Sequence, residues 1–208
     1  MSGELELRPA TAADAPSAVP LIHDAGPVSF RWVFSETTYA QSLDFLDYSF
    51  RRGDGQFGWR NHLVAERDGA VLATVAVWDA RLNATFTLSA IRHITAFYGL
   101  RAAAVMLRGL RFERVVCPPP GGVAYIGQFA VLPQSRGQGL GRAVLRHLLA
   151  QAAADGYARA GLDVAETNPR ARSLYEGLGF RLVGTRRAAL AQRWGEQVAD
   201  HHYLECAL

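Results

Sequence analysis

The densest signal in this chain is the stretch Val131-Leu132-Pro133-Gln134-Ser135-Arg136-Gly137-Gln138-Gly139-Leu140-Gly141-Arg142. It predicts a strand that runs into a glycine-rich turn and then into a helix over 139–155. Glycines permit positive φ angles, and the first turn of a helix leaves N–H groups without intrahelical partners at the positive end of its dipole. These features together make a phosphate cradle. Arg136 and Arg142 flank the turn and can add bidentate contacts to a phosphate.

Two other interpretations fit this turn less well. A tight strand-to-helix connection without a ligand does not require three glycines at alternate positions, which weaken a helix start. A dinucleotide-binding GxGxxG fingerprint fits Gly137 and Gly139, but its third glycine position is Arg142. Close packing of helix on strand requires no side chain there.

The rest of the chain alternates strands and helices around this turn. Strands are predicted over 5–8, 62–66, 71–79, 125–132, 160–165, 180–184 and 198–206. Helices are predicted over 12–24, 35–51, 139–155 and 169–178. The stretch 83–116 is too long for a simple connection and predicts two helices that separate near Tyr98-Gly99. Helices between strands favour an α/β layered fold, and we expect a single domain over 1–208 with a helical insertion over about 83–116.

Composition and cysteine usage narrow the class of protein. The chain has 208 residues, of which 50% are hydrophobic and 20% are charged, which indicates a globular protein rather than a disordered one. It has no apolar run of about 18 residues and no secretory leader pattern, so we expect a cytoplasmic protein without a membrane partner. Cys117 and Cys206 lie far apart without a CxxC pair, so neither a disulfide framework nor a metal site is expected.

The charged residues exclude further kinds of binding and catalytic site. All 22 cationic side chains are arginines, and the absence of lysine excludes a P-loop and a lysine Schiff base. The net charge of +3 is too small to predict a nucleic-acid partner, and no nucleic-acid-binding motif is present. Arginine grips phosphate bidentately, so a small polyanionic ligand suits this composition.

A second motif follows the glycine turn, and it reads Asn168-Pro169-Arg170-Ala171-Arg172-Ser173-Leu174-Tyr175-Glu176-Gly177-Leu178-Gly179-Phe180. Together with Arg136-x-x-Gly139-x-Gly141, it resembles the two motifs of the GNAT superfamily of acetyl-CoA-dependent N-acetyltransferases. The resemblance is close over 125–184 and elsewhere rests on element order. It implies a GNAT-like α/β fold, in which a mixed, mostly antiparallel sheet with a splayed central strand pair is flanked by helices. It also implies acetyl-CoA as co-substrate.

The resemblance also assigns roles to residues. Backbone groups of Phe129 and Val131 would pair with the pantetheine arm, and Asn168 would contact its far end. The pyrophosphate would be lined by Arg136, Gly137, Gln138, Gly139, Leu140, Gly141 and Arg142. Tyr175 would protonate the departing thiolate, because a basic sulfur anion needs a proton donor within hydrogen-bond reach. Tyr175 is otherwise a packing aromatic, and Asn168 a helix cap before Pro169.

The general base stays open at this point. Superfamily members that acetylate protein N-terminal alanine carry a carboxylate at the strand position matching Asp163. Other members carry an acid on the strand before the glycine turn, where 125–128 has none. Glu166 is the second candidate, and His201 and His202, with an unperturbed pKa near 6.5, are the third.

The acceptor is expected to be a primary amine of a small molecule or peptide, acetylated by direct attack in a ternary complex. The alternative is a non-catalytic acyl-CoA-binding sensor or partner-binding module. Aromatic and acidic residues over 30–54 suit a cationic amine, or else form a core helix with a solvated acidic face. The insertion could cover the acceptor pocket or pair two subunits as a homodimer. Its arginines fall near one helical face, which is typical of a solvated surface: Arg101, Arg108, Arg111 and Arg114.

Overall fold

The computed structural model describes residues 4–208, so the first three residues of the predicted domain lie outside the described part of the chain. Its centre is a seven-stranded sheet with the order β1-β2-β3-β4-β5-β7-β6. All neighbouring strands are antiparallel except β4 and β5, which are parallel. The strands are β1 (Glu6–Pro9), β2 (His62–Arg67), β3 (Ala70–Trp78), β4 (Val123–Val131), β5 (Arg159–Ala165), β6 (Arg181–Arg186) and β7 (His201–Ala207). The predicted mixed, mostly antiparallel sheet is therefore confirmed.

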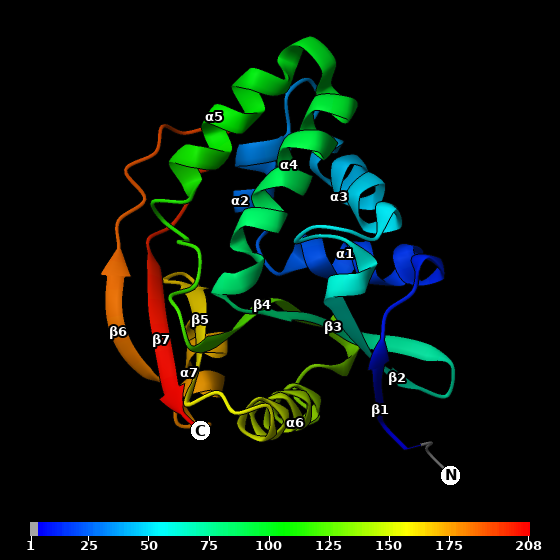
Figure 1. The fold of residues 1–208 in the computed structure, drawn as a ribbon, viewed down its shortest axis with the longest axis vertical. Coiled ribbons are helices and arrows are strands. Elements are labelled where there is room, and N and C mark those ends of the chain that lie inside the picture. Colours follow the sequence, from blue (N-terminus) through cyan, green and yellow to red (C-terminus); the bar gives the residue numbers. More distant parts are fainter. Residues whose placement is uncertain (1–3) are drawn as a thin grey trace.

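Helices cover both faces of this sheet (Figure 1). One face carries α1 (Ala15–Asp24), α2 (Pro27–Phe34), α3 (Gln41–Arg52), α4 (Asn83–Tyr98) and α5 (Ala102–Phe112). The other face carries α6 (Leu140–Ala154) and α7 (Pro169–Glu176). A hydrophobic core lies under α6 and α7, and a second core lies among α2, α3, α4 and α5. No helix within residues 4–208 is both long and apolar enough to cross a membrane.

The two parallel strands at the centre of the sheet are paired only at one end. Their register runs from Val123–Arg159 to Tyr125–Gly161, and beyond this point β5 continues to pair only with β7. The β4 strand also carries a bulge, because Ala76 and Thr74 of β3 pair with Gly127 and Ala130. The strands therefore splay apart after Tyr125, as the resemblance implies, and the bulge lies at the start of the splay.

The insertion contains two helices, as predicted. The helices separate at Gly99, whose φ of 54° lies in the region that glycine tolerates best. They pack on α2 and α3 rather than on the sheet edge, and they enclose the second core with rings such as Trp32 and Phe45. Trp32, Phe34 and Phe45 are therefore core residues in this structure, whereas Tyr39 is exposed.

Two predictions about this region are wrong. The helix predicted over 35–51 begins at Gln41, because the Gln41 Oε1 atom accepts hydrogen bonds from the backbone amides of Glu36 and Thr37 and holds 35–40 as a loop. The arginine stripe is also incomplete, since Arg108 is buried. Its Nε atom donates to the Val33 carbonyl at 2.9 Å, and its guanidinium pairs with Glu36.

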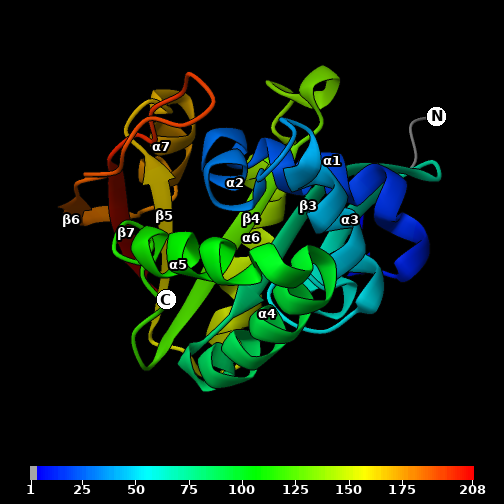
Figure 2. The ribbon, with the colours of Figure 1, turned by 90° about the horizontal axis from the view of Figure 1, so that it is seen from above.

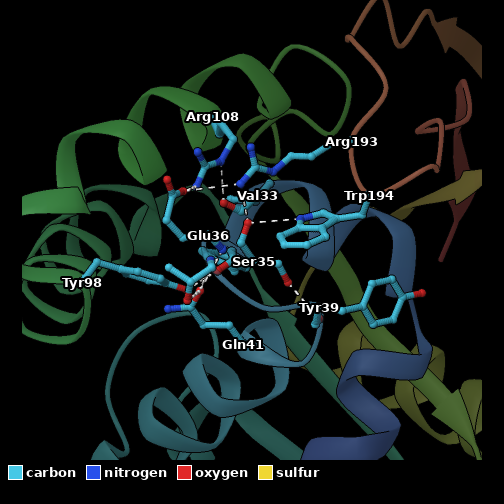
Figure 3. Close-up of polar contacts among 11 residues, drawn as sticks. Val33, Ser35, Glu36, Tyr39, Gln41, Tyr98, Arg108, Arg193 and Trp194 are labelled. Atoms are coloured by element: carbon cyan, nitrogen blue, oxygen red, sulfur yellow. Dashed lines mark hydrogen bonds and ion pairs between the residues drawn. The ribbon is translucent and has the colours of Figure 1, made fainter.

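A long connection between β6 and β7, which we call the strap (residues 187–200), crosses to the N-terminal helices. Figure 3 shows Arg193 and Trp194 of the strap both pointing at the Ser35 carbonyl, to which they donate at 2.5 and 3.3 Å. Glu36 pairs with both Arg108 of α5 and Arg193 of the strap (Figure 3). The strap, α5 and the 35–40 loop are thus joined by one polar network.

Candidate active site

The glycine turn has the geometry of a phosphate cradle. Gly137 and Gly139 adopt φ angles of 81° and 80°, and α6 begins immediately afterwards at Leu140. A Cβ atom on Gly139 would meet no other atom within 4 Å, so the approach to the first turn of α6 is open. Because the amides of that turn have no partner within the helix, they are available to an anion. These residues therefore fit the pyrophosphate of an acyl-CoA.

The two arginines of the motif lie beside this turn and bond to the protein. Arg136 donates from Nε to the Val131 carbonyl at 2.8 Å, and its guanidinium also pairs with Asp24 of α1. Arg142 donates to the Gly177 carbonyl at 3.1 Å and so joins α6 to the end of α7. Both side chains thus join neighbouring elements beside the cradle, and phosphate contact by them stays a prediction.

Gly139→Val is expected to abolish the stabilisation of the protein by acetyl-CoA. A β-branched residue is strained at positive φ and would fill the open approach to the amides. At a ligand concentration of about 100 times Kd, binding stabilises the native state by about 2.7 kcal/mol, which is about 5–10 °C in Tm for a chain of this size. Thermal melts with and without acetyl-CoA measure this shift.

Gly156→Val is the matched control for this prediction. Gly156 follows α6 at its other end, with a φ of 83° and no atom within 4 Å of an added Cβ. This variant should melt at a lower temperature but keep the full shift with acetyl-CoA. An acetyl-CoA shift that survives in Gly139→Val, or a shift produced by NAD instead, would refute the cradle assignment.

Asp163 lies at the start of the splay on the face of the sheet covered by α1–α5. Its side chain is only 3% exposed and accepts two hydrogen bonds, from the Tyr125 hydroxyl at 2.9 Å and from Arg186 Nη1 at 2.8 Å. Burial raises the pKa of this carboxyl to about 6, against the opposing effects of Arg186 and Tyr125. A carboxylate with a pKa near neutrality suits a general base.

Tyr175 lies on the opposite face of the sheet. Its ring is buried in the core beneath α6 and α7 and packs edge-on against Phe180 with the centroids 6.0 Å apart. Leu162 and Val164 belong to the same core, and strand alternation turns Asp163 away from them. Among residues 4–208, none hydrogen bonds with the Tyr175 hydroxyl. Burial raises its pKa to about 12, so the phenol stays protonated at neutral pH.

The remaining predicted site residues fall in two groups. Phe129 and Val131 lie on the part of β4 that has no partner on the β5 side. Asn168 caps α7, and its Oδ1 accepts the Ala171 amide at 3.1 Å, so the predicted capping role is confirmed. Cofactor contact by these three residues stays a prediction.

The other base candidates differ from Asp163 in their surroundings. Glu166 is exposed just beyond the end of β5. His201 and His202 are buried on β7, and each ring has a partner: the Ala199 carbonyl at 2.9 Å and the Thr185 hydroxyl at 2.9 Å. In both histidines the Nδ1 atom is therefore already engaged in a hydrogen bond within the protein.

A model of the acetyltransferase (GNAT) family matches residues 27–180, which is most of the chain and includes both motifs. The chain belongs to the GNAT family. Among curated proteins, it is 30% identical over 129 residues to N-alpha-acetyltransferase 40 of Saccharomyces cerevisiae, a match that covers 59% of this chain and 41% of that protein. It is 42% identical over 64 residues to the [ribosomal protein bS18]-alanine N-acetyltransferase of Escherichia coli strain K12, covering 31% and 43%. The chain thus matches about two fifths of the length of these relatives.

Solved structures of GNAT proteins share the fold of this chain. An N-acetyltransferase from Staphylococcus aureus Mu50 superposes with a TM-score of 0.69 at 15% identity, over 96% of this chain and 99% of that one. This likeness extends the shared architecture beyond the segment 125–184 on which the motif resemblance rests.

The contacts of Asp163 in this GNAT site were not foreseeable from its motifs. Tyr125 is adjacent through the short parallel pairing of β4 and β5, but Arg186 lies on β6, with β7 between. The only sequence signal is alternation, which places Tyr125 and Asp163 on one face once their register is known.

Asp54 is one of the acidic residues over 30–54 that suit a cationic amine acceptor. In the structure its carboxylate bonds to Ser89 at 2.8 Å and His93 at 3.0 Å, both of α4.

Proposed function

We propose that this GNAT protein transfers the acetyl group of acetyl-CoA to a primary amine, specifically the N-terminal α-amine of a peptide or protein. The observation that carries the proposal is the splay between β4 and β5, which has Asp163 on one face of the sheet and Tyr175 on the other. The printed functions of the two curated relatives, one an N-alpha-acetyltransferase and one acting on a protein alanine, support the choice of an α-amine.

The chain's own groups would hold acetyl-CoA along one line. Amides of 137–142 would bind the pyrophosphate, with Arg136 and Arg142 at the rim. The unpaired edge of β4 at Phe129 and Val131 would bind the pantetheine arm by backbone hydrogen bonds, which a strand without a neighbour offers. Followed along β4 from Val131 towards Tyr125, the pantetheine arm would end where β4 and β5 begin to pair, next to Asp163. When bound, acetyl-CoA supplies the activated acetyl group.

The transfer needs two proton movements, which the two faces of the sheet can provide. Asp163 takes a proton from the attacking ammonium, directly or through water, so that the nitrogen lone pair can form the new C–N bond. Tyr175 donates its phenolic proton to the thiolate as the C–S bond breaks. The nitrogen loses its second proton as the amide forms, and this proton, directly or through water, restores the phenol. Neither step needs a covalent acyl-enzyme, so no cysteine takes part.

Initial rates with a peptide panel test this proposal. Peptides with free α-amines should release CoA in the presence of acetyl-CoA, whereas the same peptides with blocked N-termini should not. Velocity patterns should be those of a ternary complex, and Cys117→Ala and Cys206→Ala should keep full activity. Ping-pong patterns would contradict direct attack. Transfer to free polyamines or lysine side chains in preference to α-amines would contradict the acceptor class, and binding of acetyl-CoA without any turnover would favour a sensor.

A further inference from the structure

The helical insertion carries a concentration of exposed apolar side chains. Five of the eleven large hydrophobic residues that are exposed within residues 4–208 belong to it: Leu88, Ile91, Leu100, Leu107 and Leu110. Leu100 is fully exposed at the turn between α4 and α5, and Leu107 and Leu110 are 50% and 62% exposed on α5. Clusters of exposed apolar side chains on a soluble domain mark surfaces that meet a partner.

These leucines share one side of α5 with arginines. Leu107, Leu110 and Arg111 lie on this side of α5 itself. Leu100, in the turn before the helix, and Arg114, in the turn after it, extend the same line at spacings of seven and three. Small residues, Ala103 and Ala104, fill the positions between them. The adjacent side of α5, which carries Val105 and Arg108, is buried, and Arg108 bonds to α2. We call the outward side, defined by Leu100, Ala103, Ala104, Leu107, Leu110, Arg111 and Arg114, the α5 face.

The arginines of this region have no partner in the described structure. Within residues 4–208, the side chains of Arg101, Arg111 and Arg114 make no hydrogen bond or ion pair, and all three are exposed. The nearest acid in sequence, Glu113, lies off the face between Arg111 and Arg114. The α5 face is thus apolar and cationic at once, and a complementary partner must be apolar and anionic.

A second copy of the chain does not meet this requirement. In a symmetric pair each side of a helix meets the same side of its counterpart, since the interface is made of one patch used twice. Arg111 and Arg114 lie within the face, and no carboxylate is among the face residues, so the same face of a second copy offers these arginines no anionic partner.

We propose that the α5 face binds the surface of an anionic lipid membrane. Leucines on a peripheral amphipathic helix enter the boundary between headgroups and acyl chains, while arginines at their side remain at the phosphate level. Each cationic side chain near an anionic leaflet adds to the attraction. The connection between α4 and α5 lies at one end of the molecule, at the top of the view in Figure 1, and it carries the fully exposed Leu100. An exposed apolar tip of this kind suits insertion into a surface. Surface binding needs no spanning helix.

The orientation would leave the acetyl-CoA cradle accessible. Seen from above in Figure 2, α4 and α5 lie along one side of the molecule, and the turn that leads from β4 into α6 lies on the other. Membrane binding through α5 and cofactor binding at 137–142 are therefore separable, and each can be measured without the other.

Co-sedimentation of the full chain with vesicles tests the proposal. One set of vesicles contains phosphatidylcholine with about 30% phosphatidylserine, and the other contains phosphatidylcholine alone; the chain should bind the anionic set at least about tenfold more tightly. The double variants Leu107→Ser with Leu110→Ser, and Arg111→Gln with Arg114→Gln, should each weaken that binding by about tenfold or more. All four positions are exposed, so folding should be retained, and circular dichroism confirms it.

The matched control removes exposed apolar surface elsewhere. Leu182 and Val183 of β6 are 46% and 61% exposed, and Leu182→Ser with Val183→Ser should leave vesicle binding unchanged. The acetyl-CoA thermal shift should be the same in every variant. The proposal is overturned if the native chain does not sediment with anionic vesicles, or if the control loses binding equally. It is also overturned if the protein is a dimer in solution that the leucine variants dissociate, which would assign the face to a second copy.

Discussion

Asp163→Asn is expected to lower turnover by roughly 100- to 10,000-fold, the range of a lost general base. The exchange keeps the shape of the side chain and one of its two oxygens, but it removes the charge that accepts the proton. Acetyl-CoA affinity should change little, since the cradle lies at the other end of β4. Single-turnover rates with a peptide at saturating acetyl-CoA measure the loss.

The pH dependence of the reaction gives this prediction a second readout. Burial raises the pKa of Asp163 to about 6, so the carboxyl is protonated and inactive below that pH and ionised above it. Activity of the native chain should therefore fall as the pH drops through about 6, and this acidic limb should be absent in Asp163→Asn. Because Arg186 lowers the pKa of Asp163, Arg186→Met should move the limb to higher pH.

Two further variants separate a base from a merely structural carboxylate. Tyr125→Phe removes one hydrogen bond to Asp163 and leaves its charge, so a smaller loss and an upward move of the limb are expected. Glu166→Gln should keep both rate and profile, because that side chain is exposed beyond the strand. If Glu166→Gln removes the acidic limb while Asp163→Asn retains it, the base is Glu166.

Tyr175→Phe should also lower turnover by roughly 100- to 10,000-fold, because the departing thiolate loses its proton donor. The phenol pKa of about 12 means that the native side chain carries its proton throughout the neutral range. The ring packing against Phe180 is retained in this variant, so stability and acetyl-CoA affinity should be close to those of the native chain.

Tyr157→Phe is the control for the loss of a phenol as such. Its hydroxyl donates to Asp79 at 2.6 Å, in a part of the structure away from the splay, so the rate should be unaffected although stability falls. Full activity of Tyr175→Phe would leave Tyr175 with the packing role alone.

Local sequence signals predicted the elements that carry the cradle. Glycines set the turn before α6, the break at Gly99 and the separate helices of the insertion, since positive φ is a property of the residue itself. Asn168 before Pro169 likewise predicted the start of α7. In each case the determinant lies within a few residues of the feature.

Features that depend on distant partners were not predictable. Arg108 has the spacing of a solvated stripe, yet it is buried because the 35–40 loop brings Glu36 to it. The helix α3 begins at Gln41 and not at Ser35, because the Gln41 side chain accepts hydrogen bonds from the backbone amides of Glu36 and Thr37 in that loop. Arg186 reaches Asp163 only because β7 enters the sheet between β5 and β6, an order that no short motif encodes.

The opening between β4 and β5 has a consequence for how products depart. Asp163 and Tyr175 lie on opposite sides of the sheet. In the proposed reaction the acetylated amine would leave on the side of Asp163 and CoA along β4, so each product would rebind only where its own substrate binds. CoA should compete with acetyl-CoA and not with the peptide, the acetylated peptide should compete with the peptide and not with acetyl-CoA, and the two inhibitors should add without excluding each other.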